Sequence, residues 1–178
     1  MTRLVICRHT DPADPAGAEA LGHVLRPLPL AAVHTSPLAR ARETAAAVAR
    51  EHALTPTVAE GLREIDLGDV EGLAFDDYPP DLQHALLRNP TAARFPGGET
   101  YAELRRRVCG AADEILERHP GATVAVITHA GPIRALLAAW LRIPDDAIFR
   151  LDQRYGAVNV VDWIDGVPLA RLVNGTRP

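Results

Sequence analysis

The chain has 178 residues, 47% of them apolar and 4% aromatic, and it carries a net charge of −4. This length fits one domain with a sizeable core, and we expect a single domain over residues 1–178. The mildly acidic balance argues against nucleic acid or an anionic membrane surface as a partner, and no apolar stretch is long enough to cross a bilayer.

The first predicted strand lies in residues 4–9, Leu-Val-Ile-Cys-Arg-His. Its apolar run lacks the alternation of a half-exposed strand, so it predicts a strand buried on both faces, as in parallel α/β sheets. A loop over residues 11–17, with two Asp-Pro pairs, comes next, and a short helix over residues 18–25 follows the loop.

Residues 31–34 predict a second strand. Ser36 and Pro37 then predict the N-cap and the first position of a helix. The following segment over residues 60–71 is acidic and irregular. The helix that begins at Pro37 is expected to have one apolar face, formed by Leu38, Ala41, Ala45 and Val48.

A helical stretch is expected over residues 76–87, and a loop over residues 90–98 follows it. Thr100 and Glu103 have the spacing of a capping box, which predicts the start of a long helix. The His-Pro-Gly sequence at residues 119–121 ends this helix.

Residues 123–128 predict another strand buried on both faces, and a helix follows from Gly131-Pro132 to about Leu141. Three more strands are expected, the last two joined by an Asp-Gly hairpin turn at residues 165–166: 147–151, 157–163 and 168–173. Strands that alternate with helices, plus a terminal hairpin, predict a three-layer α/β/α fold with a mostly parallel sheet.

Chemistry-bearing side chains stand where two buried strands end. Arg8 and His9 end the first strand, and His129 follows the strand over residues 123–128. Ligands of such sheets bind beyond the carboxyl ends of the strands. A neutral imidazole is a competent nucleophile, and an arginine can bind two oxygens of a tetrahedral anion. The plainer alternatives are a strand-end arginine and satisfied core histidines.

Two further fragments carry candidate residues. Arg40 lies in the first turn of its helix and shares a face with Thr44, although a surface arginine is the plainer interpretation. Arg42 points elsewhere and is expected to be a solvated charge. A general acid is needed to protonate a leaving alkoxide. Spacing alone leaves five acids open for this role: Glu60, Glu64, Asp66, Asp69 and Glu71.

Five ordered fragments together carry a resemblance: Arg8-His9-Thr10, residues 36–45, residues 62–72, residues 96–100 and His129-Ala130-Gly131. In this order they resemble the histidine phosphatase superfamily, in particular its phosphoglycerate mutase-like branch and the small bacterial phosphatases within it. The resemblance spans residues 4 to about 174. It implies a phosphoglycerate mutase-like fold and catalysis that needs neither a metal nor another cofactor.

The resemblance also implies roles for matching residues. His9 would attack phosphorus and become a phosphohistidine, and Glu64 would be the general acid and then the base for water. Arg8, Arg40 and a cationic His129 would hold the phosphoryl oxygens. Two further positions, Thr10 and Ala130, are also expected to contact substrate. Thr10 stands where the family has glycine, and the family's asparagine has no counterpart in residues 11–15.

We therefore expect a histidine acid-type phosphatase that hydrolyses small-molecule phosphomonoesters. The protein is expected to be cytoplasmic, because its N-terminus lacks a leader pattern. Its oligomeric state is open between a monomer and a homodimer that pairs through the outer strand of the hairpin. Cys7 and Cys109 are expected to be buried reduced thiols.

Four alternatives accompany this reading. A mutase is disfavoured because Leu67 stands where mutases carry tyrosine, and because residues 74–96 offer only Arg88 and Arg94 as cations. The changed loop after His9 leaves room for a weakly active phospho-ligand binding protein. A metallohydrolase would face repulsion between its metal and the two site arginines. A cysteine phosphatase needs arginine six residues after its cysteine, and neither cysteine has one.

Overall fold

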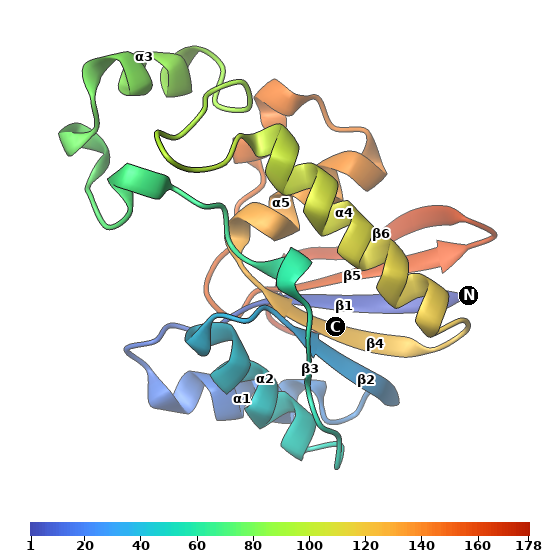
Figure 1. The fold of residues 1–178 in the computed structure, drawn as a ribbon. Helices are drawn as coiled ribbons and strands as arrows, with labels where there is room; N and C mark the ends of the chain where they lie inside the picture. The colour runs from blue at the N-terminus through green and yellow to red at the C-terminus, as the bar shows by residue number, and fades with distance from the viewer.

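The computed structural model describes residues 1–178, apart from the side chain of residue 145. A six-stranded sheet in the order β3-β2-β4-β1-β5-β6 forms its centre (Figure 1). The first four of these strands run parallel, and β5 and β6 pair antiparallel. The strands are β1 (Thr2–Arg8), β2 (Leu30–Thr35), β3 (Thr57–Val58), β4 (Thr123–Thr128), β5 (Val158–Ile164) and β6 (Val167–Gly175).

Helices cover both faces of the sheet (Figure 1). On one face lie α1 (Pro15–Leu25) and α2 (Ala39–Arg50), and on the other lie α4 (Tyr101–Arg118) and α5 (Ala130–Leu141). The prediction of a three-layer α/β/α fold with a mostly parallel sheet is confirmed. No helix in the described part of the chain is long and apolar enough to span a membrane.

Strand β1 is buried on both faces, as its unbroken apolar run predicts. Leu4 and Ile6 pack in the core under α4 and α5, whereas Val5 and Cys7 pack under α1 and α2, and all four are fully buried. The capping box of α4 and the hairpin turn at residues 165–166 also form as predicted. Of the two cysteines expected to be buried, Cys109 is only half-buried.

A long arm leaves the sheet between β3 and α4. It contains three 3₁₀ turns, η1 (Glu60–Leu62), η2 (Gly68–Val70) and η3 (Phe75–Asp77), and the short helix α3 (Pro80–Arg88). A small apolar cluster of its own holds the arm together, formed by Val70, Leu82, Ala93 and Phe95. The arm rises above the edge of the sheet where β1 and β4 end (Figure 1).

Helix α1 starts earlier than predicted, and another predicted helix is divided in two. Helix α1 begins at Pro15, three residues early, because the Asp14 side chain accepts the Ala16 N–H and proline fits the first turn. The helix predicted over 76–87 is divided into η3 and α3. The divide falls at Tyr78 and Pro79, which are extended because each precedes a proline.

The predicted strand over residues 147–151 is also wrong. This stretch belongs to the 3₁₀ helix η4 (Asp145–Arg150). Its backbone is satisfied locally, since Ala147 N–H donates to the Pro144 carbonyl and Leu151 N–H to that of Ile148. Ile148 is buried in the core from this conformation, so a sheet neighbour is not needed to cover it.

Candidate active site

The predicted residues meet at the carboxyl edge of the parallel strands. Arg8 at the end of β1 is in register with Thr128 at the end of β4, so His9 and His129 leave the sheet side by side. Their ring centroids are 5.0 Å apart. Arg40, in the first turn of α2, donates from Nε to His9 Nε2 at 3.2 Å. These side chains therefore lie close enough together to bind one anion.

His9 is buried and its tautomer is fixed by the backbone. Nδ1 lies 2.8 Å from the Thr10 carbonyl oxygen, which can only accept, so Nδ1 carries the proton and Nε2 keeps its lone pair. Burial, the main cause, together with Arg40 and Arg8 lowers the pKa of His9 to about 4, against the opposing hydrogen bond to Thr10. His9 is therefore a neutral imidazole near pH 7, with Nε2 directed at Arg40.

Arg8 is held from two sides. Its Nη1 donates to the Gln153 carbonyl at 2.6 Å, and its guanidinium carbon lies 3.9 Å from the ring centre of Tyr155. The Tyr155 ring is also 5.4 Å from that of His9. Arg8 Nε is buried without a hydrogen-bond partner among the side chains and backbone that the structure describes. An anion beside His9 would supply the acceptor that this donor lacks.

His129 is fully buried and is held by Ser36. Its Nε2 lies 2.7 Å from Ser36 Oγ, while its Nδ1 is buried with no hydrogen-bond partner in the described part of the chain. Burial first, and then Arg40, His9 and Arg8, lower the pKa of His129 to about 3. The expectation of a cationic His129 is therefore wrong for the protein alone, since only a bound anion would offset these causes. The prediction that Ser36 is an N-cap is wrong, because α2 begins at Ala39 and its N-cap is Leu38.

Glu64 is the acid that the structure places at the site. Its Oε1 accepts from Ile65 N–H at 2.9 Å, and its Oε2 accepts from Gly131 N–H at the start of α5 at 3.4 Å. Desolvation raises the pKa of Glu64 despite these hydrogen bonds and the opposing charges of Arg40 and Arg8. A half-buried carboxyl with a raised pKa suits a general acid. The other four candidate acids of residues 60–71 are exposed.

The structure places Thr10 beside Thr44 and Ala130 at the start of α5. The Thr10 hydroxyl and amide both lie 3.2 Å from Thr44 Oγ1. The group of Thr10 that contacts His9 is its carbonyl. Ala130 is the buried first residue of α5. Thr44 also donates to the Arg40 carbonyl at 3.0 Å, which links the loop after β1 to the first turn of α2.

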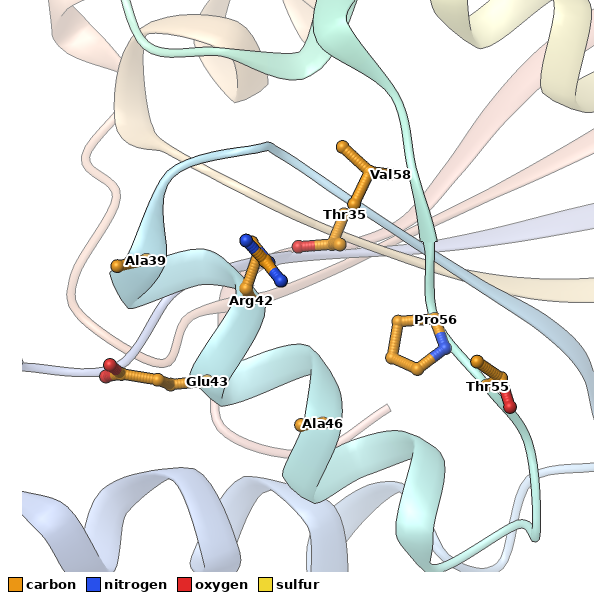
Figure 2. A pocket seen from close by; sticks show the side chains of 8 residues that line it. All are labelled: Thr35, Ala39, Arg42, Glu43, Ala46, Thr55, Pro56 and Val58. Atoms are coloured by element: carbon orange, nitrogen blue, oxygen red, sulfur yellow. The ribbon is translucent and has the colours of Figure 1, made fainter.

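Arg42 lies outside this site, as predicted. It is exposed and lines a hollow of about 530 Å³ between α2 and β3 (Figure 2). That hollow also contains Glu43 and Val58, but neither His9 nor Arg40 lines it. Of the two arginines in the first half of α2, only Arg40 therefore belongs to the candidate site.

Three contacts of the site were not foreseen: Ser36 on His129, Tyr155 on Arg8 and Gln153 on Arg8. Tyr155 could have been found from the predicted hairpin. A strand that runs antiparallel to β1 begins at the edge where β1 ends, and Tyr155 lies just before β5. Among the described side chains, no three histidines, cysteines or acids are grouped as metal ligands would be.

Comparison with known proteins gives one family. Residues 14–176 match the model of the histidine phosphatase superfamily (branch 1). The matched range begins after Arg8 and His9, so placing these two residues in the site rests on the distances and contacts described above. Bacillus stearothermophilus YhfR has the same fold, with 26% identity, a TM-score of 0.90, and coverage of 100% of this chain and 98% of that chain.

Two curated relatives are longer than this chain. The "Bifunctional protein Rv2228c" of Mycobacterium tuberculosis (strain ATCC 25618 / H37Rv) is 37% identical over 161 residues, which are 88% of this chain and 44% of that protein. The "Probable phosphoglycerate mutase GpmB" of Yersinia pestis (strain Pestoides F) is 30% identical over 139 residues, 76% of this chain and 65% of that protein. The chain thus spans less than two thirds of either relative.

Proposed function

The chain belongs to branch 1 of the histidine phosphatase superfamily, and from this premise we propose that it hydrolyses phosphate monoesters through a phosphohistidine on His9. The observation that carries the proposal is the environment of His9 Nε2. The Thr10 carbonyl keeps the proton on Nδ1, and the unprotonated Nε2 accepts a hydrogen bond from Arg40 Nε at 3.2 Å, which a phosphoryl oxygen would take over. A nucleophile and a cation that can neutralise a phosphoryl oxygen are thus already together.

In the first proposed step, the Nε2 lone pair attacks phosphorus. The P–N bond forms while the bond from phosphorus to the ester oxygen breaks, and the electron pair leaves with that oxygen. Arg8, Arg40 and His129 hold the other phosphoryl oxygens, for which Arg8 Nε and His129 Nδ1 are the unpartnered buried nitrogens. Glu64, in the protonated form that its raised pKa favours, gives its proton to the leaving alkoxide.

In the second proposed step, water attacks the phosphohistidine. Glu64, now a carboxylate, takes a proton from the water, the P–N bond breaks, and its electron pair returns to Nε2. Inorganic phosphate leaves, and both His9 and Glu64 regain their starting protonation states. One carboxyl thus acts as acid and then as base, as microscopic reversibility requires of a single group at this position.

The pKa directions support an acid-type enzyme. His9 stays neutral down to about pH 4, the pKa to which its surroundings lower it. Glu64 stays protonated to a higher pH than an exposed glutamic acid, because desolvation raises its pKa. Both groups are in the required form on the acid side of neutrality. We propose a cytoplasmic small-molecule phosphomonoesterase whose residues 1–178 act as one domain without a bound metal.

Phosphoglycerate mutation is the second candidate, favoured by the relative named as a mutase. The arm offers little to a second charged group, however. Arg94 is already used by Glu103, at 2.7 Å, and by the Gly98 carbonyl. Of the two arginines in residues 74–96, this leaves Arg88, and Leu67 cannot donate the hydrogen bond that a tyrosine would supply. Hydrolysis is therefore the function that these residues support best.

The test is metal-free hydrolysis of a panel of phosphomonoesters by the wild-type chain and by His9→Ala. The proposal expects phosphate release by the wild type and none by the variant. Hydrolysis by neither protein would overturn the proposal. Rapid isomerisation of 3-phosphoglycerate when 2,3-bisphosphoglycerate is added would instead favour the mutase.

A further inference from the structure

Arg107 of α4 directs its whole guanidinium at the segment that carries Glu64. Its Nε and Nη2 donate to the two carboxylate oxygens of Glu99, both at 2.7 Å. Its Nη1 donates to the carbonyls of Gly61, at 3.0 Å, and Arg63, at 2.8 Å. Its Nη2 donates also to the Glu64 carbonyl at 2.9 Å. A guanidinium has five N–H groups, so all of them are used here.

Glu99 completes the arrangement on the other side of Glu64. Its Oε2 accepts from Asp66 N–H at 3.1 Å. Burial would raise the pKa of Glu99, but the hydrogen bonds from Arg107 and from the Asp66 amide outweigh it and lower the pKa. Glu99 is therefore an ionised partner of Arg107, and the pair holds the backbone before and after Glu64.

The segment around Glu64 is not supported by regular secondary structure. Residues 63–67 belong to no helix or strand, so no ladder of backbone hydrogen bonds fixes them. Below them, Leu62 is fully buried and its carbonyl accepts from Thr128 Oγ1 at 2.6 Å. The segment also lies directly on α4, since a Cβ added at Gly61 would come within 2.7 Å of Ala111 Cβ. Past Leu62, Ile65 packs against the core and Glu64 accepts from the Gly131 amide of α5, while the Arg107–Glu99 pair holds the backbone of residues 63, 64 and 66.

We propose that Arg107 and Glu99 are positioning residues for the general acid. This inference rests on the proposed function, in which Glu64 protonates the leaving group. The ion pair fixes the backbone around Glu64, so that its carboxyl stays at the Gly131 amide, out of water and beside the ester oxygen. Neither Arg107 nor Glu99 is given a contact with the substrate.

The proposal makes a prediction that depends on the leaving group. An alkoxide leaving group needs a proton from Glu64 to leave readily, whereas p-nitrophenolate leaves as an anion and hardly needs one. Misplacing a catalytic group by about 1 Å can cost about 100-fold in rate. Loosening the Arg107–Glu99 pair, which we call the clamp, should therefore slow phosphoryl transfer from an alkyl phosphate and leave transfer from p-nitrophenyl phosphate nearly unchanged. The value of kcat/KM reports phosphoryl transfer to His9, because it includes only the steps up to the release of the alcohol.

The test compares Arg107→Lys and Glu99→Gln with the wild type on glycerol 2-phosphate and on p-nitrophenyl phosphate. Arg107→Lys keeps the positive charge but cannot supply five donors in a fixed plane. Arg118→Lys is the matched control, because Arg118 is also in α4 but, among the described residues, its side chain bonds only to the exposed Glu114. Glu64→Gln gives the pattern expected when the acid itself is lost.

The expected result is a fall of about 10-fold or more in kcat/KM for glycerol 2-phosphate in both clamp variants, with less than about 3-fold for p-nitrophenyl phosphate. The basic limb of the pH profile for glycerol 2-phosphate should move to lower pH, because a loosened Glu64 becomes more hydrated and its pKa falls. The control should match the wild type on both substrates.

Equal losses on both substrates, or no loss on either, in folded variants would overturn the clamp while leaving the proposed function intact. If one clamp variant fails to fold in a thermal unfolding scan, the other decides the question. Absence of hydrolysis by the wild type is a separate outcome that overturns the proposed function and the clamp together.

Discussion

Gly131 provides a sharp test of where Glu64 acts. A Cβ built at Gly131 would overlap Glu64 Oε1, much closer than real Cβ contacts come. In Gly131→Ala the carboxyl must therefore withdraw, by about 1 Å, to reach an ordinary van der Waals distance. The end of a glutamate side chain can move at little cost to folding. The proton that it should deliver, however, would no longer meet the leaving oxygen.

The expected magnitude follows from that displacement. A misplacement of about 1 Å costs about 100-fold in rate, equivalent to about 2.7 kcal/mol of transition-state stabilisation. Stability should not fall, because alanine in place of glycine near the start of α5 favours the helix by up to about 1 kcal/mol. The variant should thus be folded and slow.

The assay is kcat/KM on an alkyl phosphate together with thermal unfolding. Gly110→Ala is the control, since Gly110 lies inside α4 and an added Cβ there meets nothing within 4 Å. The control should keep wild-type rates and gain stability. Wild-type rates in folded Gly131→Ala would refute the placement of Glu64 as the acid.

Other predictions follow from the same geometry. Arg40→Ala should lose about 100-fold or more in kcat, because it removes a preorganised charge donor, whereas Arg42→Ala should keep wild-type rates; equal losses would remove the distinction. The chelator EDTA should leave activity unchanged, and inhibition that added divalent metal reverses would count against a metal-free site. The pKa values of His9 and His34 are lowered to about 4 and that of His129 to about 3, from 6.5, mainly by burial. Only the unfolded chain therefore takes up these protons as pH falls from about 6.5 to about 4, so the free energy of unfolding should decrease over this window. Urea titrations at pH 7 and pH 5 with equal results would contradict the linkage.

The parts of the site that the sequence predicts are those carried by strand ends. Arg8, His9 and His129 each follow an unbroken apolar run, and the rule that parallel strands end at one edge brings them together. Arg40 follows from its place in the first turn after the next strand. The periods of the apolar residues also predict the layers of the fold, because β1 can be buried on both faces only if helices cover both.

The acid could not be chosen from the residues alone. Residues 60–71 have no regular period, and five carboxylates stand in them at similar spacing. Only tertiary packing distinguishes Glu64, which meets the Gly131 amide while the other four face solvent. The resemblance to a family supplied the choice, and the burial of Glu64 gives it a physical reason.

Two failures, at Ser36 and at residues 147–151, arise because local rules compete with tertiary contacts, whereas the bounds of α1 and α3 follow from prolines and a local cap. Ser36 has the residue type of an N-cap, but its hydroxyl lies 2.7 Å from His129 and the helix starts three residues later. Residues 147–151 are apolar enough for a strand, yet Ile148 is buried from a 3₁₀ turn. Short apolar runs do not distinguish these outcomes.

The central claim is that His9 Nε2 forms a covalent bond to phosphorus during turnover. The most direct measurement is rapid quenching of the enzyme into alkali during hydrolysis of a phosphomonoester, followed by mass spectrometry of the peptide that contains His9. We expect a phosphoryl group on His9 that acid removes and alkali preserves, and none in His9→Ala. Active enzyme that never carries phosphate on His9, or an equal yield of phosphoenzyme from His9→Ala, would contradict the mechanism.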